Sequence, residues 1–371
     1  MKTPGTTALR RFGRSVARLA RTRYPAFLFG GEVPPGEVPV FTYHDVRAEV
    51  LRADLEFLAA NGYRTVRVAE FHSRMLEGGA GRERLVLLAF DDARRNFWEV
   101  AYPLLAAHRT HAVLFVPSYW VGDSARMFMT WDELRECRRA DFVDVESHAH
   151  RHALVYTSPR LAGFASPAAL ARHDLFDWPM RRERDGDRCG YPPLGTPIYE
   201  SAPLLSAERR LLEPAAAVQA CRELVATQGA ERFFGRPGWQ ERLLSAHDSV
   251  PGGHRLERIS EAATRALAAT ELAQAAECFE RELGSRPRFF AYPWMLGSAD
   301  SQGLLRDLGL VASFGVALDF RRARRERSPL PAYGRYKSDW LRFLPGQGRR
   351  RLRDVVPQKC MRFVSSQHLA H

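Results

Sequence analysis

Two adjacent carboxylates, Asp91 and Asp92, follow directly on the apolar run Leu85–Phe90. The run has the length of a fully buried strand, and the carboxyl ends of such strands are where open α/β sheets and barrels hold their active sites. Two neighbouring carboxylates repel each other and lose hydration there unless a positive group lies close. The pair therefore predicts a metal ion or an arginine beside it. The alternative is a helix N-cap, a position that aspartate favours.

His148 and His152 lie four residues apart, after the predicted strand 142–146. This spacing can place two imidazoles on one side of a helical turn, as two ligands of one ion require, but surface or structural histidines show it too. Position favours a metal site, because these histidines and Asp91-Asp92 all follow predicted strands. Two histidines and one aspartate leave the fourth position of a tetrahedral Zn²⁺ open for water, and the second aspartate can then act as the base.

The elements that must position these residues alternate between strand and helix, which predicts parallel strands with helical crossovers. Strands are expected at 39–46, 85–90, 111–117, 142–146, 289–293 and 311–318, and helices at 50–61, 97–108, from 130, 214–227, 256–283 and 303–308. Between residues 153 and 251 the pattern breaks down, and proline, glycine and aromatic residues accumulate. We interpret this stretch as an insertion over the active face, whose aromatics Trp178, Tyr191, Tyr199 and Trp239 either pack within it or stack on the rings of a ligand.

The net charge of +12 is concentrated in three patches: residues 1–24, 321–327 and 349–353. Within the first, residues 8–21 form a basic amphipathic pattern, typical of a helix on an anionic membrane surface or of a helix docked on the protein itself. The patches lack interleaved aromatics, so nucleic-acid binding is the weakest reading. Five scattered cysteines without CxxC spacing argue against a disulfide framework and a cysteine zinc site. With no secretory signal recognised, we expect a cytoplasmic protein, at the inner face of the membrane if residues 8–21 bind it.

Four segments, in order, resemble the motifs of the polysaccharide deacetylases, carbohydrate esterases of the chitooligosaccharide deacetylase type with a NodB homology domain. Ala-Phe-Asp-Asp-Ala at 89–93 resembles Thr-Phe-Asp-Asp-Gly. Residues 130–133, followed by Glu-Ser-His-Ala-His-Arg-His at 146–152, resemble a tryptophan-containing helix and Gly-Ser-His-Thr-x-x-His. Phe-Ala-Tyr-Pro-Trp at 290–294 and Phe-Thr-Tyr-His-Asp at 41–45 resemble two further motifs.

The resemblance implies an α/β fold, a distorted (β/α) barrel over residues 39–320 with the 153–251 insertion. Residues 1–38 would be an N-terminal helix and linker, and residues 321–371 a basic tail. It also implies site roles. Asp91 would be the general base. Asp92, His148 and His152 would be the ligands of a divalent metal, for which Zn²⁺ is the expected ion. Tyr292, Pro293 and Trp294 would lie around the oxyanion and the substrate.

The resemblance is incomplete at four places. Ala93 and Glu146 replace motif glycines, and Ala291 stands where some members have an arginine that orients the base. The late Leu-x-x-x-His that would provide the catalytic acid has no counterpart. His44 at the end of the first strand is the expected acid; its alternative role is a hydrogen bond that fixes a metal ligand or the first strand. His247 within the insertion is the second candidate for the acid, and if it is not catalytic we expect it in an exposed loop.

The expected function is metal-dependent removal of N-acetyl or related acyl groups from an amino sugar of a glycan or glycan precursor. The alternative is a catalytically degenerate saccharide-binding protein in a membrane-associated glycan-assembly complex.

Overall fold

The computed structural model describes residues 25–78, 81–123, 125–183, 185–252, 255–316 and 330–351. The predicted helix at 8–21 lies outside these ranges. Within them the chain forms two compact units. The first contains the described parts of 1–148, 276–291 and 309–371, and the second contains 149–275 and 292–308. Among the described residues, no helix combines the length and apolarity needed to cross a bilayer.

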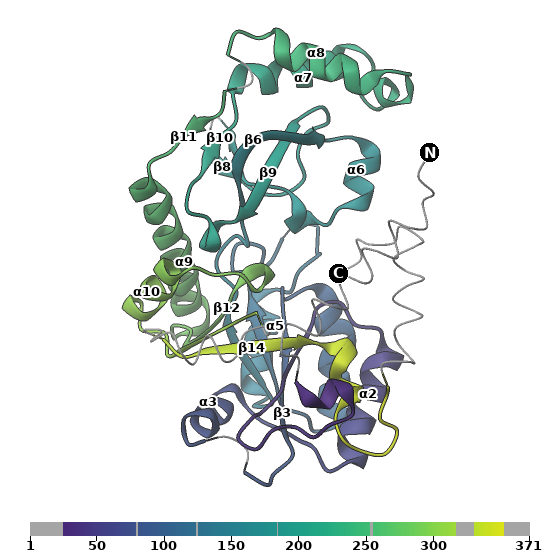
Figure 1. The fold of residues 1–371 in the computed structure, drawn as a ribbon, viewed down its shortest axis with the longest axis vertical. Helices are drawn as coiled ribbons and strands as arrows, with labels where there is room; N and C mark the ends of the chain where they lie inside the picture. Colours follow the sequence, from purple (N-terminus) through teal and green to yellow (C-terminus); the bar gives the residue numbers. More distant parts are fainter. Residues whose placement is uncertain are drawn as a thin grey trace. The chain divides into compact units, whose positions relative to one another are not determined.

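The first unit is a closed barrel of seven parallel strands with helical crossovers (Figure 1). In spatial order the strands are β1 (Val40–Tyr43), β14 (Ala332–Lys337), β13 (Ala312–Val316), β12 (Phe289–Ala291), β5 (Val143–Ser147), β4 (Ala112–Val116) and β3 (Leu85–Phe90). Pairing of β1 with β3, in the register Val40 to Leu87, closes the barrel, and the short β2 (Arg64–Thr65) adds to β3. The predicted barrel is thereby confirmed.

Helices connect these strands, and all but the one at 68–76 lie where the sequence predicts a helix. They are α2 (Ala48–Ala60), α3 (Val68–Leu76), α4 (Tyr102–Ala107) and α5 (Trp131–Arg139). A π-helical turn, Phe97–Ala101, leads into α4. Thr130 and Glu133 form a reciprocal capping box at the start of α5, so this helix begins where the sequence indicates. The long helix α9 (Glu261–Leu283) leads back toward β12.

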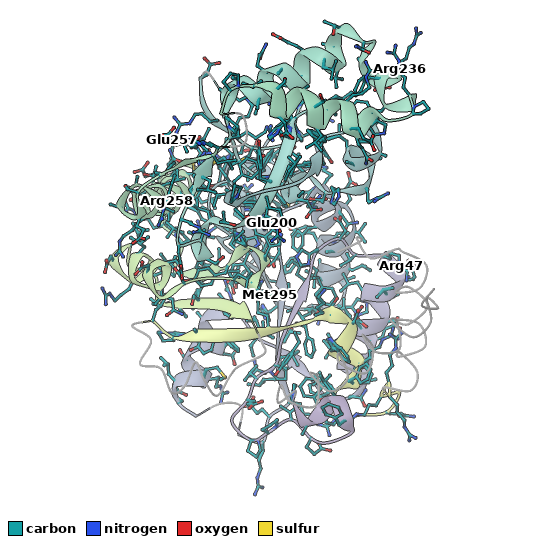
Figure 2. All side chains as sticks on the ribbon, turned by 45° about the horizontal axis from the view of Figure 1, so that its top comes forward. Arg47, Glu200, Arg236, Glu257, Arg258 and Met295 are labelled. Carbon is teal, nitrogen blue, oxygen red and sulfur yellow. The ribbon has the colours of Figure 1, made fainter. Side chains whose placement is uncertain are left out.

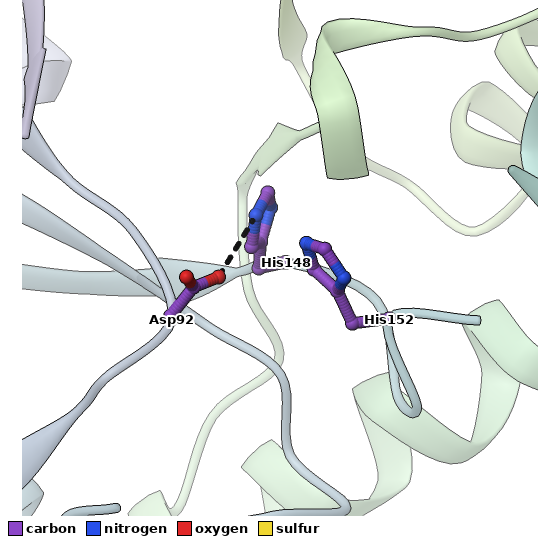
Figure 3. A group of neighbouring side chains, drawn as sticks. All are labelled: Asp92, His148 and His152. Atoms are coloured by element: carbon purple, nitrogen blue, oxygen red, sulfur yellow. Dashed lines mark ion pairs between the residues drawn. The ribbon is translucent and has the colours of Figure 1, made fainter. Parts of the chain in front are cut away.

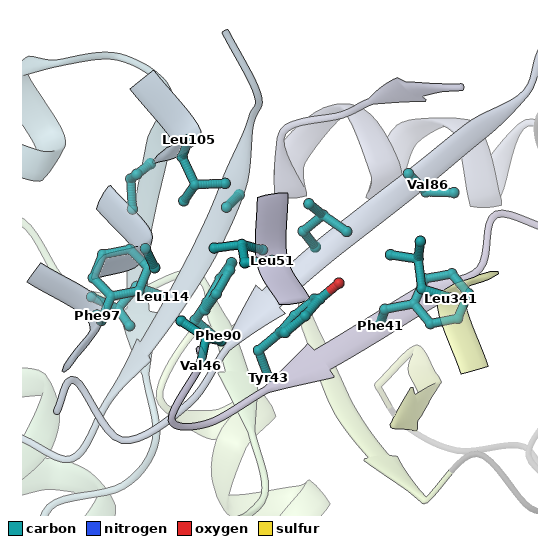
Figure 4. Close-up of a cluster of buried hydrophobic side chains, with 14 of the residues drawn as sticks. Phe41, Tyr43, Val46, Leu51, Val86, Phe90, Phe97, Leu105, Leu114 and Leu341 are labelled. Atoms are coloured by element: carbon teal, nitrogen blue, oxygen red, sulfur yellow. The ribbon is translucent and has the colours of Figure 1, made fainter. Parts of the chain in front are cut away.

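Strand side chains alternate between two apolar clusters, as the period of two in a strand requires. On β3, Val86, Leu88 and Phe90 pack with residues of α2 and α4 in the outer cluster (Figure 4). Leu87 and Ala89 pack with residues of β4, β12 and β13 in the inner cluster. Full burial of each large apolar side chain contributes about 1.5–3 kcal/mol, so β3 is fixed on both faces and its carboxyl end is held rigidly.

One barrel strand lies where the sequence predicts a tail. β14 occupies residues 332–337, beyond the boundary expected at residue 320, and pairs in parallel with both β13 and β1. Its sequence, Ala-Tyr-Gly-Arg-Tyr-Lys, contains glycine and two cations and so lacks the apolar run that identifies a buried parallel strand.

The second unit is built on an antiparallel sheet with the order β11 (Glu257–Arg258), β10 (Leu211–Leu212), β6 (Leu154–Phe164) and β9 (Pro197–Pro203). Strands β7 (Arg181–Glu183) and β8 (Gly186–Arg188) form a hairpin that does not pair with this sheet. Helices α6 (Pro167–Arg172), α7 (Ala215–Thr227), α8 (Trp239–Ser249) and α10 (Ala299–Asp307) complete it. The predicted helix 214–227 is confirmed. Charged side chains such as Arg236 and Glu257 are exposed on this unit (Figure 2).

The aromatic residues singled out in the insertion mostly pack within the second unit. Tyr199 and Trp178 are buried, and Trp239 is half-buried in a cluster with Phe234. Tyr191 alone among the four is well exposed. Packing therefore accounts for three of these four side chains.

Candidate functional site

Asp91 and Asp92 lie in a tight turn at the carboxyl end of β3. The Asp91 N–H donates to the Tyr43 carbonyl at 2.9 Å, which extends the β1–β3 ladder by one residue. Asp92 and Ala93 then adopt left-handed backbone conformations, with φ of 74° and 49°. A side chain in this region costs about 1–2 kcal/mol, which explains why the motif resembled here has glycine where this chain has Ala93. Both carboxylates are buried.

The positive group predicted beside the aspartates is Arg335 of β14. Its Nη1 donates to both carboxylate oxygens of Asp91, at 2.7 and 2.8 Å, and both side chains are almost completely buried. His44 Nε2 lies 3.8 Å from Asp91 Oδ2 and keeps 39% of its side chain exposed. Burial raises the pKa of Asp91, but Arg335, together with His148 and His44, outweighs it and holds that pKa below its ordinary value. Asp91 is therefore an ionised carboxylate at neutral pH.

His148 follows β5 and is oriented by the backbone of β12. Its Nδ1 lies 2.7 Å from the Ala291 carbonyl, which can only accept, so Nδ1 carries the proton and the lone pair is on Nε2. Nε2 lies 3.6 Å from Asp92 Oδ1 and 3.9 Å from Asp91 Oδ2. Burial holds the pKa of His148 below its ordinary value despite the two aspartates, so the ring is neutral. A metal-binding histidine is usually a neutral imidazole whose other ring nitrogen, the one that does not bind the metal, donates a hydrogen bond to a carbonyl or carboxylate.

Asp92, His148 and His152 are brought together as predicted (Figure 3). One ligand atom from each lies within 4.8 Å of the others, and all three residues are buried. One carboxylate oxygen and two imidazole nitrogens form a donor set that suits a divalent metal and leaves coordination positions open. The three residues thus fit the metal site that the sequence predicts.

The His152 ring is held between two aromatic side chains. Its centroid lies 4.2 Å from those of both Phe176 and Trp294. Trp294 lies in the single turn Pro293–Met295, where Trp294 and Met295 have φ of 50° and 60°. The preceding Tyr292 is buried, and its hydroxyl accepts a hydrogen bond from Ser301 Oγ at 3.2 Å. The role predicted for Tyr292, Pro293 and Trp294 in binding the oxyanion and substrate stays a prediction.

Three features of the site were missed or misjudged in the sequence. The arginine sought at residue 291 comes instead from β14, as Arg335. Arg94 lies with its Nε 3.6 Å from Asp92 Oδ2 and its guanidinium 5.6 Å from the centre of the Phe128 ring. His247, expected in an exposed loop if it is not catalytic, is buried in α8 and hydrogen-bonds Tyr199 and Asp248 at 2.8 and 2.7 Å. Of these three residues, only Arg94 could have been recognised from the local sequence, because it lies close to the Asp-Asp motif.

Comparison with known proteins agrees with the motifs. Residues 78–166 match the family model described as polysaccharide deacetylase. Poly-beta-1,6-N-acetyl-D-glucosamine N-deacetylase of Escherichia coli is 29% identical over 119 residues, which are 29% of this chain and 18% of that protein. The chain therefore matches less than a fifth of the length of that relative.

Among solved structures, the fold is similar to that of the BpsB deacetylase domain from Bordetella bronchiseptica. The TM-score is 0.50 at 17% sequence identity, over 82% of this chain and 97% of that domain. The matched segment 78–166 contains the Asp91-Asp92 turn and both histidines of the ligand cluster. The match to the polysaccharide deacetylase model over residues 78–166 therefore agrees with the order of the motifs, and the barrel has the fold of a solved deacetylase domain.

Proposed function

We propose that this protein is a divalent-metal-dependent hydrolase that removes N-acetyl, or related acyl, groups from an amino sugar of a glycan or glycan precursor. The observation that carries the proposal is the ligand cluster Asp92, His148 and His152, with an ionised second aspartate, Asp91, beside it. Zn²⁺ suits the two nitrogens and one oxygen of the cluster and is the metal we propose. When bound, such an ion acidifies a water molecule and polarises the acyl carbonyl.

Asp91 has the properties of a general base. It is ionised, its Oδ2 lies within 4 Å of Nε2 of both His148 and His44, and Arg335 holds it in one orientation. A base fixed in this way can take the proton of an attacking water without reorienting. Because Arg335 keeps the carboxylate charged inside an apolar barrel, the base remains ready at neutral pH.

His44 is the proposed acid that protonates the departing amine. It follows β1, which pairs with β3 in the barrel, and its Nε2 lies 3.8 Å from Asp91 Oδ2. Its side chain is partly exposed, so it can exchange protons with solvent. A positioned acid is worth roughly 10²–10⁴ in rate. His247 is the weaker candidate, because both of its ring nitrogens are engaged by Tyr199 and Asp248.

The second candidate function is saccharide binding without turnover, in a glycan-assembly complex at a membrane. One observation favours it: no Leu-x-x-x-His follows the Phe-Ala-Tyr-Pro-Trp motif at 290–294. The retained Asp91–Arg335 pair argues against it, since a buried ion pair has no role in sugar binding alone and is costly to keep.

Release of acetate tests the proposal. The protein should be loaded with Zn²⁺, incubated with β-1,6-linked and β-1,4-linked N-acetylglucosamine oligomers and with a nucleotide-linked N-acetylamino sugar, and assayed for free acetate. Asp91→Asn is the matched control, because the amide keeps the shape of the side chain and lacks the base. Acetate release by the wild type that Asp91→Asn abolishes supports hydrolysis. Oligomer binding without acetate from any substrate supports the second candidate.

The cellular setting is also proposed rather than observed. We propose a cytoplasmic location at the inner face of the membrane, where the basic pattern at residues 8–21 would bring the protein to anionic lipid. A substrate attached to lipid would suit that setting.

A further inference from the structure

Glu146 stands where the motif resembled by this chain has glycine, two residues before His148. On β5, Val143 and Val145 pack in the outer apolar cluster. Since successive side chains of a strand point to opposite faces, Asp144, Glu146 and His148 share the opposite face. The chain thus places a carboxylate on the same face as a proposed metal ligand, where glycine would have no side chain.

The Glu146 carboxylate binds the start of β12. Its Oε2 accepts hydrogen bonds from the backbone N–H groups of Arg288 and Phe289, at 2.8 and 2.9 Å. β5 and β12 share one register pair, Ser147 with Phe290. Glu146 therefore links the start of β12 to β5 by two hydrogen bonds, as additional rungs of a β-ladder would, and it satisfies two backbone N–H groups there.

The other end of the three-residue strand β12 is Ala291, whose carbonyl accepts the hydrogen bond from His148 Nδ1. β12 is consequently tied to β5 at both ends, by Glu146 at its start and by His148 at its end. A shift of β12 along β5 would move the Ala291 carbonyl away from the imidazole. His148 would then lose the hydrogen bond that fixes its tautomer and directs Nε2 toward Asp92.

We infer that Glu146 is a positioning residue for the metal ligand His148, acting through the backbone of β12. Its carboxylate fixes the strand, the strand fixes the Ala291 carbonyl, and the carbonyl fixes the imidazole. The inference rests on the proposed metal site for its functional consequence, whereas the tautomer of His148 can be observed without any metal.

Three variants test the chain of contacts. Glu146→Gln keeps an oxygen that can accept both N–H groups and should behave as the wild type. Glu146→Met has similar length without an acceptor, and Glu146→Ala removes the side chain in case methionine does not fold. Asp144→Met is the matched control: Asp144 lies on the same face of β5, but its carboxylate accepts from the Val68 N–H of α3, at 2.8 Å, and not from β12.

The first readout is the tautomer of His148 in the chelator-treated protein, by long-range ¹H–¹⁵N correlation of ¹⁵N-histidine-labelled samples. Wild type, Glu146→Gln and Asp144→Met should show a single Nδ1–H form. Glu146→Met or Glu146→Ala should show a mixture of tautomers. An unchanged single Nδ1–H form in a folded Glu146→Met or Glu146→Ala protein would overturn the inference.

The second readout is Zn²⁺ affinity, measured by competition with a chromophoric chelator. Loss of a partner that orients a metal-binding histidine typically weakens binding about 10–100-fold, which we expect for Glu146→Met with recovery in Glu146→Gln. Equal weakening in Asp144→Met would indicate general destabilisation and contradict the inference. If the wild type itself binds no Zn²⁺, the proposed function fails, while the tautomer result still decides whether Glu146 positions His148.

Discussion

Replacing Arg335 by methionine removes the positive charge of the buried pair and keeps most of its volume. Asp91 is 3% exposed and Arg335 2%, and a single Nη1 bonds both carboxylate oxygens. Removing one partner of a buried ion pair leaves the other charge uncompensated, which typically costs about 3–5 kcal/mol. We expect a loss of this size in the free energy of unfolding of the metal-free Arg335→Met protein near neutral pH.

The loss of stability in Arg335→Met should become smaller as the pH falls. In the wild type the pKa of Asp91 is below that of the unfolded chain, so its contribution to stability is present at neutral pH and is lost as the pH falls through the folded pKa. In Arg335→Met, burial is no longer opposed by the guanidinium, and the pKa of Asp91 rises above its unfolded value. The variant then gains stability from protonating Asp91 as the pH falls, and its deficit relative to the wild type should shrink.

Urea unfolding of both proteins with chelator present, from about pH 8 to about pH 4, measures this deficit. The matched control is Arg342→Met, because Arg342 forms another arginine–aspartate pair of the barrel, 3.0 Å from the buried Asp54. Both variants should be destabilised, but only Arg335→Met should lose acetate release near neutral pH. A deficit for Arg335→Met under about 1 kcal/mol at every pH would refute the assignment of Arg335 as the counter-charge of Asp91.

Two further predictions concern the acid and the N-terminus. His44→Ala should lower kcat at least about a hundredfold, with its metal content unchanged, and His247→Ala should do much less; the reverse order in steady-state assays would assign the acid to the insertion. Deleting residues 1–24 removes seven Lys/Arg, each worth about 1 kcal/mol near an anionic surface. The truncated protein should therefore no longer sediment with anionic liposomes and should keep its activity on soluble substrate, whereas equal sedimentation would exclude membrane contact through this segment.

The sequence predicts the part of the site that local pattern encodes. The apolar run before Asp91 and Asp92 is long enough to identify β3. His148 and His152 follow β5, the second barrel strand after β3 along the chain. Since parallel strands present their carboxyl ends at one edge, the order of motifs along the chain was sufficient to bring these carboxylates and imidazoles together.

Arg335 could not be found in this way, because nothing in its neighbourhood marks a barrel strand. It is separated from Asp91 by 244 positions in the chain and lies in a strand with glycine and two cations. Its place follows only from closure of the barrel between β13 and β1. The second unit was recognised as an insertion but not as a sheet. Its long strand β6 contains a proline and a glycine, β9 begins and ends with proline, and β10 and β11 contain only two residues each, so none shows a clear period of two.

Metal stoichiometry in matched variants tests most directly the central claim that Asp92, His148 and His152 hold a divalent metal beside the base Asp91. Wild type, Asp91→Asn and His152→Ala should each be dialysed against Zn²⁺, passed through a desalting column and assayed by elemental analysis. The account predicts one equivalent of zinc in the wild type and in Asp91→Asn, and almost none in His152→Ala. Undiminished zinc in His152→Ala would contradict it.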